Sequence, residues 1–200
     1  MPERIQLSPE LTIRLSDPEA IPRQVTLNGR PYTVEKPVGA GFKGIVWKVI
    51  DSFGMSWALK LCIHEDYESR SYMQEVSRAA KLRPYPQFAQ INDAGIVEIE
   101  LGNGTRQSFV AFLEEWVEGV TLEKFIEKHL EQITPSFLLA YVRHLCAALA
   151  ALDAVALRHD DLHAGKLMIC PPPPGSLSGG WGIKVIDTGS LKPATMPIHK

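Results

Sequence analysis

The chain has 200 residues, and its 21 basic and 23 acidic side chains give a formal net charge of −2. This balance argues against a protein that binds nucleic acid or a membrane surface, and a hydrophobic fraction of 45% is typical of a globular chain. Three cysteines without a CxxC pair favour neither a disulfide framework nor a zinc site. The N-terminus has no apolar signal core, so we expect a soluble, cytoplasmic protein.

The first half of the chain is rich in strand signals. Residues 1–24 contain four prolines and form an irregular leader. The elements expected after it, in chain order, are a hairpin at Asn28-Gly29, strands over 44–50 and 57–63, a helix over 65–82, and strands over 96–101 and 108–114.

The second half changes character after Gly119. Its expected elements are helices over 121–130 and 136–155, strands over 167–170 and 183–186, and a surface loop over 171–182. Apolar residues nearly surround the longer helix, which predicts that it is buried. A sheet-rich half followed by a helix-rich half suggests two lobes with a cleft between them.

A glycine-rich segment gives the first functional signal. Gly39, Gly41, Gly44 and Val46 fit the pattern GxGxxGxV, which in isolation is also compatible with a plain hairpin turn. A dinucleotide site needs a helix directly after the glycines, whereas residues 45–50 are β-branched and aromatic. The pattern therefore favours a glycine loop between two strands that covers nucleotide phosphates.

A lysine on the following strand fits the same interpretation. Lys60 comes sixteen residues after Gly44, and strand alternation places Ala58 on the same face, where a small side chain can line adenine. A buried ammonium needs a partner, and we expect a helical glutamate. Glu75 is the first choice and Glu68 the second, although either one could be an ordinary surface glutamate.

Three further segments carry a family resemblance. Residues 159–166 (HDDLHAGK) look like a catalytic loop, residues 184–189 (KVIDTG) look like the strand leading into a metal-binding aspartate, and residues 112–119 (FLEEWVEG) look like a hinge. Together with the glycine loop, they make residues 32–189 resemble the protein-kinase superfamily, nearest to atypical bacterial serine/threonine kinases and aminoglycoside-type small-molecule kinases.

The resemblance implies an α+β, bilobal protein-kinase-like fold. The N-lobe, an antiparallel sheet plus one helix, would span 25–114, the hinge 115–119, and an incomplete helical C-lobe 120–200. The cofactors implied are ATP and Mg²⁺. The roles implied are a catalytic base at Asp161, a metal ligand at Asp187, an ion pair between Lys60 and Glu75, and adenine contacts at Glu115 and Val117.

Three residues depart from the family pattern. Lys166 stands where the family has a metal-binding asparagine, and an ammonium cannot ligate a cation, so Lys166 either contacts phosphate in place of a second Mg²⁺ or disables the enzyme. Thr188 replaces a phenylalanine whose packing, in the family that the chain resembles, distinguishes active from inactive states. Asp160 replaces an arginine and is expected to be a solvated loop aspartate.

The leading functional prediction is an ATP- and Mg²⁺-dependent phosphotransferase that modifies serine or threonine in proteins. The alternatives are a pseudokinase that acts as a nucleotide-binding regulatory module, and a small-molecule kinase, which His163 favours. The chain ends eleven residues after Gly189, so we expect an exposed apolar face on the long helix. A protein substrate, a regulatory partner or a second copy of the chain would be its partner.

Overall fold

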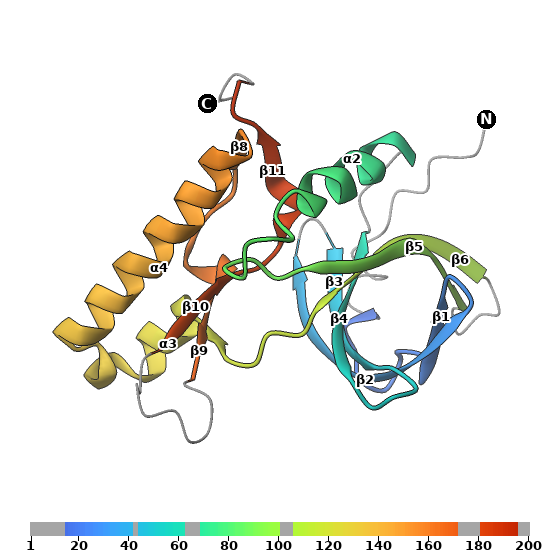
Figure 1. Ribbon diagram of the computed structural model, residues 1–200. Helices are drawn as coiled ribbons and strands as arrows, with labels where there is room; N and C mark the ends of the chain where they lie inside the picture. The colour runs from blue at the N-terminus through green and yellow to red at the C-terminus, as the bar shows by residue number, and fades with distance from the viewer. Residues whose placement is uncertain (1–14, 42–43, 63–68, 101–105, 172–180, 196–200) are drawn as a thin grey trace. The chain divides into compact units, whose positions relative to one another are not determined.

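The computed structural model describes residues 15–41, 44–62, 69–100, 106–171 and 181–195. The chain forms two compact units (Figure 1). The sheet unit comprises residues 1–76 and 91–116, and the mixed unit comprises residues 77–90 and 117–200.

The sheet unit consists mainly of one six-stranded antiparallel sheet with the strand order β1-β2-β3-β4-β6-β5. Its strands are β1 (Gln24–Leu27), β2 (Arg30–Gly41), β3 (Gly44–Ile50), β4 (Ser56–Cys62), β5 (Ile91–Glu100) and β6 (Arg106–Glu115). The tight turn between β1 and β2 confirms the hairpin predicted there, because Asn28 and Gly29 have φ values of 49° and 77°.

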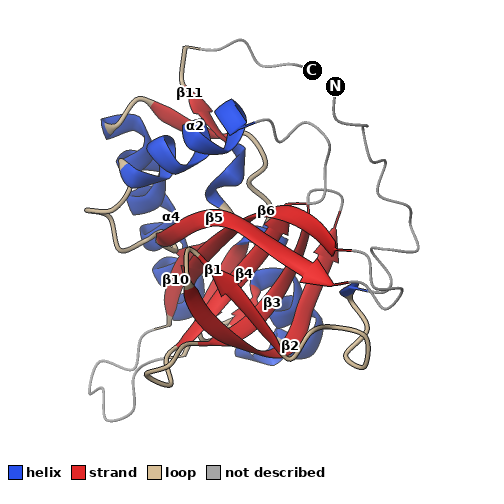
Figure 2. Cartoon of the chain, turned by 90° about the vertical axis from the view of Figure 1, so that its right-hand side faces the viewer, coloured by secondary structure: helices blue, strands red, loops and turns tan. Residues whose placement is uncertain are grey.

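The sheet curves until its two edge strands approach each other, which gives it a nearly closed, barrel-like form (Figure 2). At one end the side-chain Nδ2 of Asn28, just after β1, donates to the Ala94 carbonyl oxygen on β5 at 3.0 Å. Side chains that alternate along each strand fill the inside, among them the fully buried Trp47, Leu59 and Val97. Trp47 Nε1 donates to the Leu15 carbonyl at 2.8 Å, so this buried N–H is satisfied.

The predicted fold class, a bilobal α+β kinase-like fold with a helical C-lobe, is wrong. The described residues form mostly antiparallel sheet, with three α-helices: α2 (Ser69–Ala80), α3 (Leu122–Lys128) and α4 (Pro135–Ala154). The second half adds five short strands rather than a helical lobe: β7 (Val120–Thr121), β8 (Leu157–His159), β9 (Leu167–Cys170), β10 (Gly182–Val185) and β11 (Leu191–Pro193). Three of these strands have only two or three residues, which is too few for the sequence to show the alternation of apolar and polar residues that marks a strand.

The mixed unit contains a three-stranded sheet, β10-β9-β7, and the pair β11-β8. α4 packs against β10 and β8. The two helices of this unit that lie after residue 120 both begin with a threonine cap: the Lys124 amide donates to Thr121 Oγ1 and the Phe137 amide to Thr134 Oγ1. The rings of Phe125 and Phe137 stack at 5.1 Å and form part of the core of this unit.

The prediction that the long helix is buried is wrong. α4 buries a narrow stripe that includes Phe137 and Leu152, whereas Leu138, Leu139 and Val142 are about half exposed. Among the described residues α4 is also the one helix long and apolar enough to cross a membrane, although core helices of soluble proteins meet the same criterion. A partner that covers this apolar face stays a prediction. The cytoplasmic location also stays a prediction.

Candidate functional site

The first group of predicted site residues lies on the outer face of the sheet. Gly39 on β2, Val46 on β3 and Lys60 on β4 are direct cross-strand neighbours. Residues that pair directly across antiparallel strands point to the same face of a sheet. The intervening positions, such as Ile45 and Leu61, fill the inside, so Gly39, Val46 and Lys60 form one row on the opposite face. The spacing between Gly44 and Lys60 predicts that the following strand returns beneath the glycine loop, and the pairing of β3 with β4 agrees with this.

The structure brings Lys60 and Glu75 together. Lys60 Nζ lies 3.9 Å from Glu75 Oε1, and each residue is only 5% exposed. Glu75 reaches the strand from α2, whose Tyr72 ring makes an edge contact with Phe112, the β6 neighbour of Lys60. Removing two charges from water carries a large desolvation cost, so a buried ion pair of this kind requires a reason beyond stability. The second candidate partner, Glu68, lies outside the described residues.

The glycines of the motif have different structural requirements. A Cβ at Gly44 would lie 2.2 Å from the Leu61 carbonyl oxygen, so the close approach of β3 and β4 requires glycine there. At Gly39 nothing lies within 4 Å of the position that a Cβ would occupy, and the packing does not require glycine. Gly41 pairs with Gly44, and residues 42–43 lie outside the described part of the chain. The open backbone at Gly39 is therefore accessible to a ligand.

The residues predicted to contact adenine belong to both units. Ala58 shares the outer face with Lys60 and pairs with Glu114 on β6. Glu115 ends β6 in the sheet unit, whereas Val117 belongs to the mixed unit and is 9% exposed. The adenine contacts at Glu115 and Val117 stay a prediction.

The second group of predicted site residues lies in the mixed unit. Lys166 Nζ forms an ion pair with Asp187 Oδ2. The backbone supports this contact, because the Ile186 amide donates to the Lys166 carbonyl at 2.9 Å. Asp187 has φ 60° and ψ 66°, a left-handed conformation that is uncommon for residues other than glycine and is frequent at functional sites.

His159 connects the segments that carry Asp161 and Asp187. Its Nδ1 accepts a hydrogen bond from the Asp161 amide at 3.3 Å. The proton of a neutral ring therefore resides on Nε2, which donates to the Asp187 carbonyl oxygen at 3.1 Å. Burial lowers the pKa of His159, which favours this neutral form. These contacts give His159 a structural role between the two segments.

Asp160 is an exposed residue in a turn, which confirms the prediction of a solvated loop aspartate. It also accepts hydrogen bonds from Arg158 Nε at 2.6 Å and Lys192 Nζ at 2.7 Å, which were not predicted. These two bonds lower the pKa of Asp160 to about 2. Arg158 lies two residues before Asp160, so the sequence alone could have indicated this contact. Lys192 reaches Asp160 only through the pairing of β11 with β8.

The metal prediction depends on Asp187. Within the described part of the chain, no three His, Cys, Asp or Glu side chains form a cluster that could hold a metal ion. Mg²⁺ commonly binds one or two carboxylates and takes its other ligands from water and substrate phosphates, so a lone Asp187 suits it chemically. Lys166 already neutralises that carboxylate, and a cation would have to compete with it.

Comparison with known proteins adds no family assignment. No protein-family model matches the sequence, and no curated protein is similar to it. The functional interpretation therefore depends on the side chains described above.

Proposed function

We propose that the chain is an ATP- and Mg²⁺-dependent phosphotransferase with a serine or threonine hydroxyl of a protein as the acceptor. The proposal rests on side-chain chemistry and not on the fold class, because one fold hosts many functions and similar chemistry recurs on different folds. The observation that carries it is the buried Lys60–Glu75 ion pair beside the open backbone of Gly39.

In the sheet unit, Lys60 provides the positive charge for phosphate oxygens. Glu75 restricts the ammonium to one position, so little side-chain entropy is lost when phosphate binds. Gly39, two strands away in the same row, allows a phosphate group to approach the backbone closely. Ala58 leaves space on the same face for an apolar base.

In the mixed unit, Asp161 is the group that accepts the proton of the attacking hydroxyl. The hydrogen bond from its amide to His159 holds this segment beside Asp187. Mg²⁺, when bound at Asp187, would supply positive charge to the nucleotide phosphates. Phosphoryl transfer depends mainly on such positioning and charge stabilisation, so few residues are needed.

One observation favours a second candidate, a nucleotide-binding module without transfer activity. The Lys166 ammonium on Asp187 supplies positive charge without a metal ion. A protein of this second class would bind ATP through Lys60 and leave the phosphates intact.

The test is a transfer assay with the full chain, γ-labelled ATP, Mg²⁺ and casein as a generic acceptor. We expect label transfer that Asp161→Asn abolishes while ATP binding is retained. Transfer that persists in Asp161→Asn would contradict the assignment of the base. ATP binding without transfer, weakened by Lys60→Met, would establish the second candidate instead. A folded chain that binds no ATP would overturn both.

A further inference from the structure

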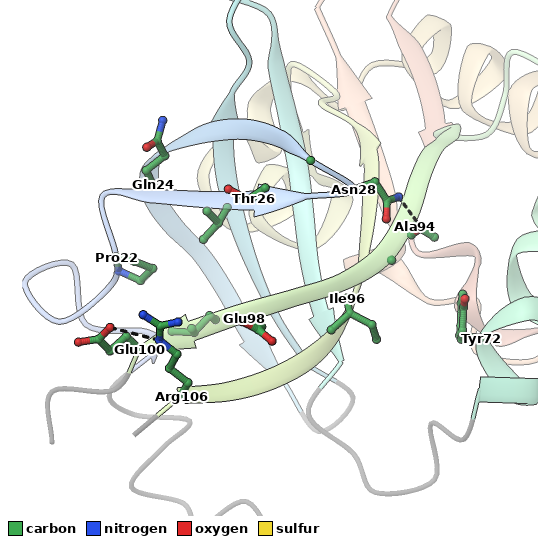
Figure 3. Close-up of a pocket in the computed structure, with 14 residues that line it drawn as sticks. Pro22, Gln24, Thr26, Asn28, Tyr72, Ala94, Ile96, Glu98, Glu100 and Arg106 are labelled. Carbon is green, nitrogen blue, oxygen red and sulfur yellow. Dashed lines mark hydrogen bonds and ion pairs between the residues drawn. The ribbon is translucent and has the colours of Figure 1, made fainter. Parts of the chain in front are cut away.

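A second feature of the sheet unit is unrelated to the proposed nucleotide chemistry. Between the edge strands β1 and β5 lies a pocket of about 810 Å³ (Figure 3). Its walls include Gln24 and Thr26 on one side and Ile96, Glu98 and Glu100 on the other. This volume is within the range of binding sites for ligands.

The pocket is wedge-shaped because the two edges meet at one end only. The side-chain Nδ2 of Asn28 donates to Asp93 Oδ1 and to the Ala94 carbonyl oxygen and closes that end. A Cβ at Gly95 would lie 2.5 Å from Asn28 Oδ1, so glycine permits this contact. From there the strands diverge towards Gln24 and Glu100, as Figure 3 shows.

Both edges direct backbone polar groups into the pocket. The Val34 amide donates to the Arg23 carbonyl, so in the alternating antiparallel pattern Gln24 and Thr26 point their N–H and C=O groups away from β2. Thr26 pairs with Pro31, which has no N–H, in agreement with this pattern.

On the other edge, the Ala94 carbonyl points towards β1, because it accepts from Asn28. By the same alternation Ile96, Glu98 and Glu100 direct their backbone groups away from β6 and into the pocket. A sheet edge with open backbone donors and acceptors is a template for an additional strand.

We propose that this pocket binds an extended peptide segment of a partner protein, which adds to β5 as a seventh strand. The segment is expected to carry basic side chains at alternate positions. Glu98 and Glu100 are exposed, lie two residues apart and therefore point to the same face, where they would meet those side chains. Glu100 also forms an exposed ion pair with Arg106 of the pocket lining at 3.6 Å, so a basic side chain of the peptide would compete with Arg106 there. The peptide backbone supplies the hydrogen bonds, and the charges select the sequence.

The test uses fluorescein-labelled Thr-Lys-Val-Lys-Val-Thr with blocked ends as the probe and the full chain in fluorescence anisotropy. A matched peptide carries N-methyl groups on alternate residues, which removes the backbone donors on one edge and leaves the charge unchanged. We expect saturable binding of the first peptide and at least tenfold weaker binding of the second. Hydrogen exchange at the Ile96 and Glu98 amides should slow when the first peptide binds.

The charge contribution is tested with Glu98→Lys/Glu100→Lys, and Glu127→Lys/Glu131→Lys, which makes the same change in the mixed unit, is the control. We expect at least tenfold weaker peptide binding in the first variant and no change in the control, with equal thermal midpoints. Equal binding of the methylated peptide, or no saturable binding at millimolar probe, would overturn the proposal.

Discussion

The ammonium of Lys166 forms an ion pair with the carboxylate of Asp187, and the two side chains are only 23% and 13% exposed. Asp187 is also the residue that we propose as the Mg²⁺ ligand. A unit charge and a divalent ion about 4 Å apart repel each other by roughly 8 kcal/mol at an effective dielectric constant of about 20. Mg²⁺ and the Lys166 ammonium therefore exclude each other at this carboxylate.

Replacement of Lys166 should consequently increase the affinity for Mg²⁺. We expect Lys166→Asn to bind Mg²⁺ at least tenfold more tightly in the presence of a non-hydrolysable ATP analogue, measured by calorimetry. Lys166→Met is the control, because it removes the ammonium without adding a metal-binding oxygen. An Mg²⁺ affinity that is the same in all three proteins would contradict the exclusion.

The Lys60–Glu75 pair predicts a non-additive effect on stability. Lys60→Met leaves a buried carboxylate without its cation, which should lower the free energy of unfolding by about 3–5 kcal/mol. Lys60→Met/Glu75→Leu should regain most of that loss, because apolar side chains replace both charges. Urea denaturation of the single and double variants measures the coupling. Losses that simply add would show that the two charges do not interact.

The two glycines Gly44 and Gly39 form a matched pair for substitution. Gly44→Ala places a methyl group against the Leu61 carbonyl and should lower the free energy of unfolding by about 1–3 kcal/mol. Gly39→Ala meets nothing within 4 Å and should leave stability nearly unchanged. Under the proposed function, Gly39→Ala weakens ATP binding instead. Thermal unfolding and ATP titration separate the two effects, and a large loss of stability in Gly39→Ala would contradict this account.

The hydrogen bonds of Asp160 predict a pH dependence in acid. Its pKa is about 2 in the folded protein, below the ordinary value of 3.8, so the unfolded chain binds more protons between these values. The contribution is fully present above pH 4 and is lost as the pH falls towards 2. Asp160→Asn should reduce the slope of stability against pH in this window. An unchanged slope, measured by urea denaturation at several pH values, would indicate that the two hydrogen bonds do not persist in solution.

Local elements could be predicted where the chemistry is local. The Asn28-Gly29 turn was visible because that pair tolerates positive φ. The strand over 167–170 was visible from its apolar run and is confirmed as β9. β5 begins at Ile91, five residues before the predicted strand, since Asn92, Asp93 and Gly95 disfavour a strand in isolation.

The fold class could not be read from these elements. It depends on the approach of β1 to β5, which Asn28 and Ala94 make across 66 positions of the sequence. Nothing in the local pattern of either strand specifies that contact. The pocket between these strands was missed for the same reason.

One contact between candidate site residues was more predictable than the fold. The sequence places Glu75 on the face of the predicted helix that points inward, which made it the first choice as the partner of Lys60. The two side chains lie together in the structure. The Lys166–Asp187 contact was not foreseen, although the two residues were singled out separately. It requires the pairing of β9 with β10, which places position 166 beside position 186.

The most direct test of the central claim is the affinity for ATP, measured by calorimetry with Mg²⁺ present. Wild type is compared with Lys60→Met/Glu75→Leu, which keeps the sheet stable without the charges. The account predicts saturable binding to wild type and at least tenfold weaker binding to the double variant. Equal affinities in the two folded proteins, or no binding to wild type, would contradict it.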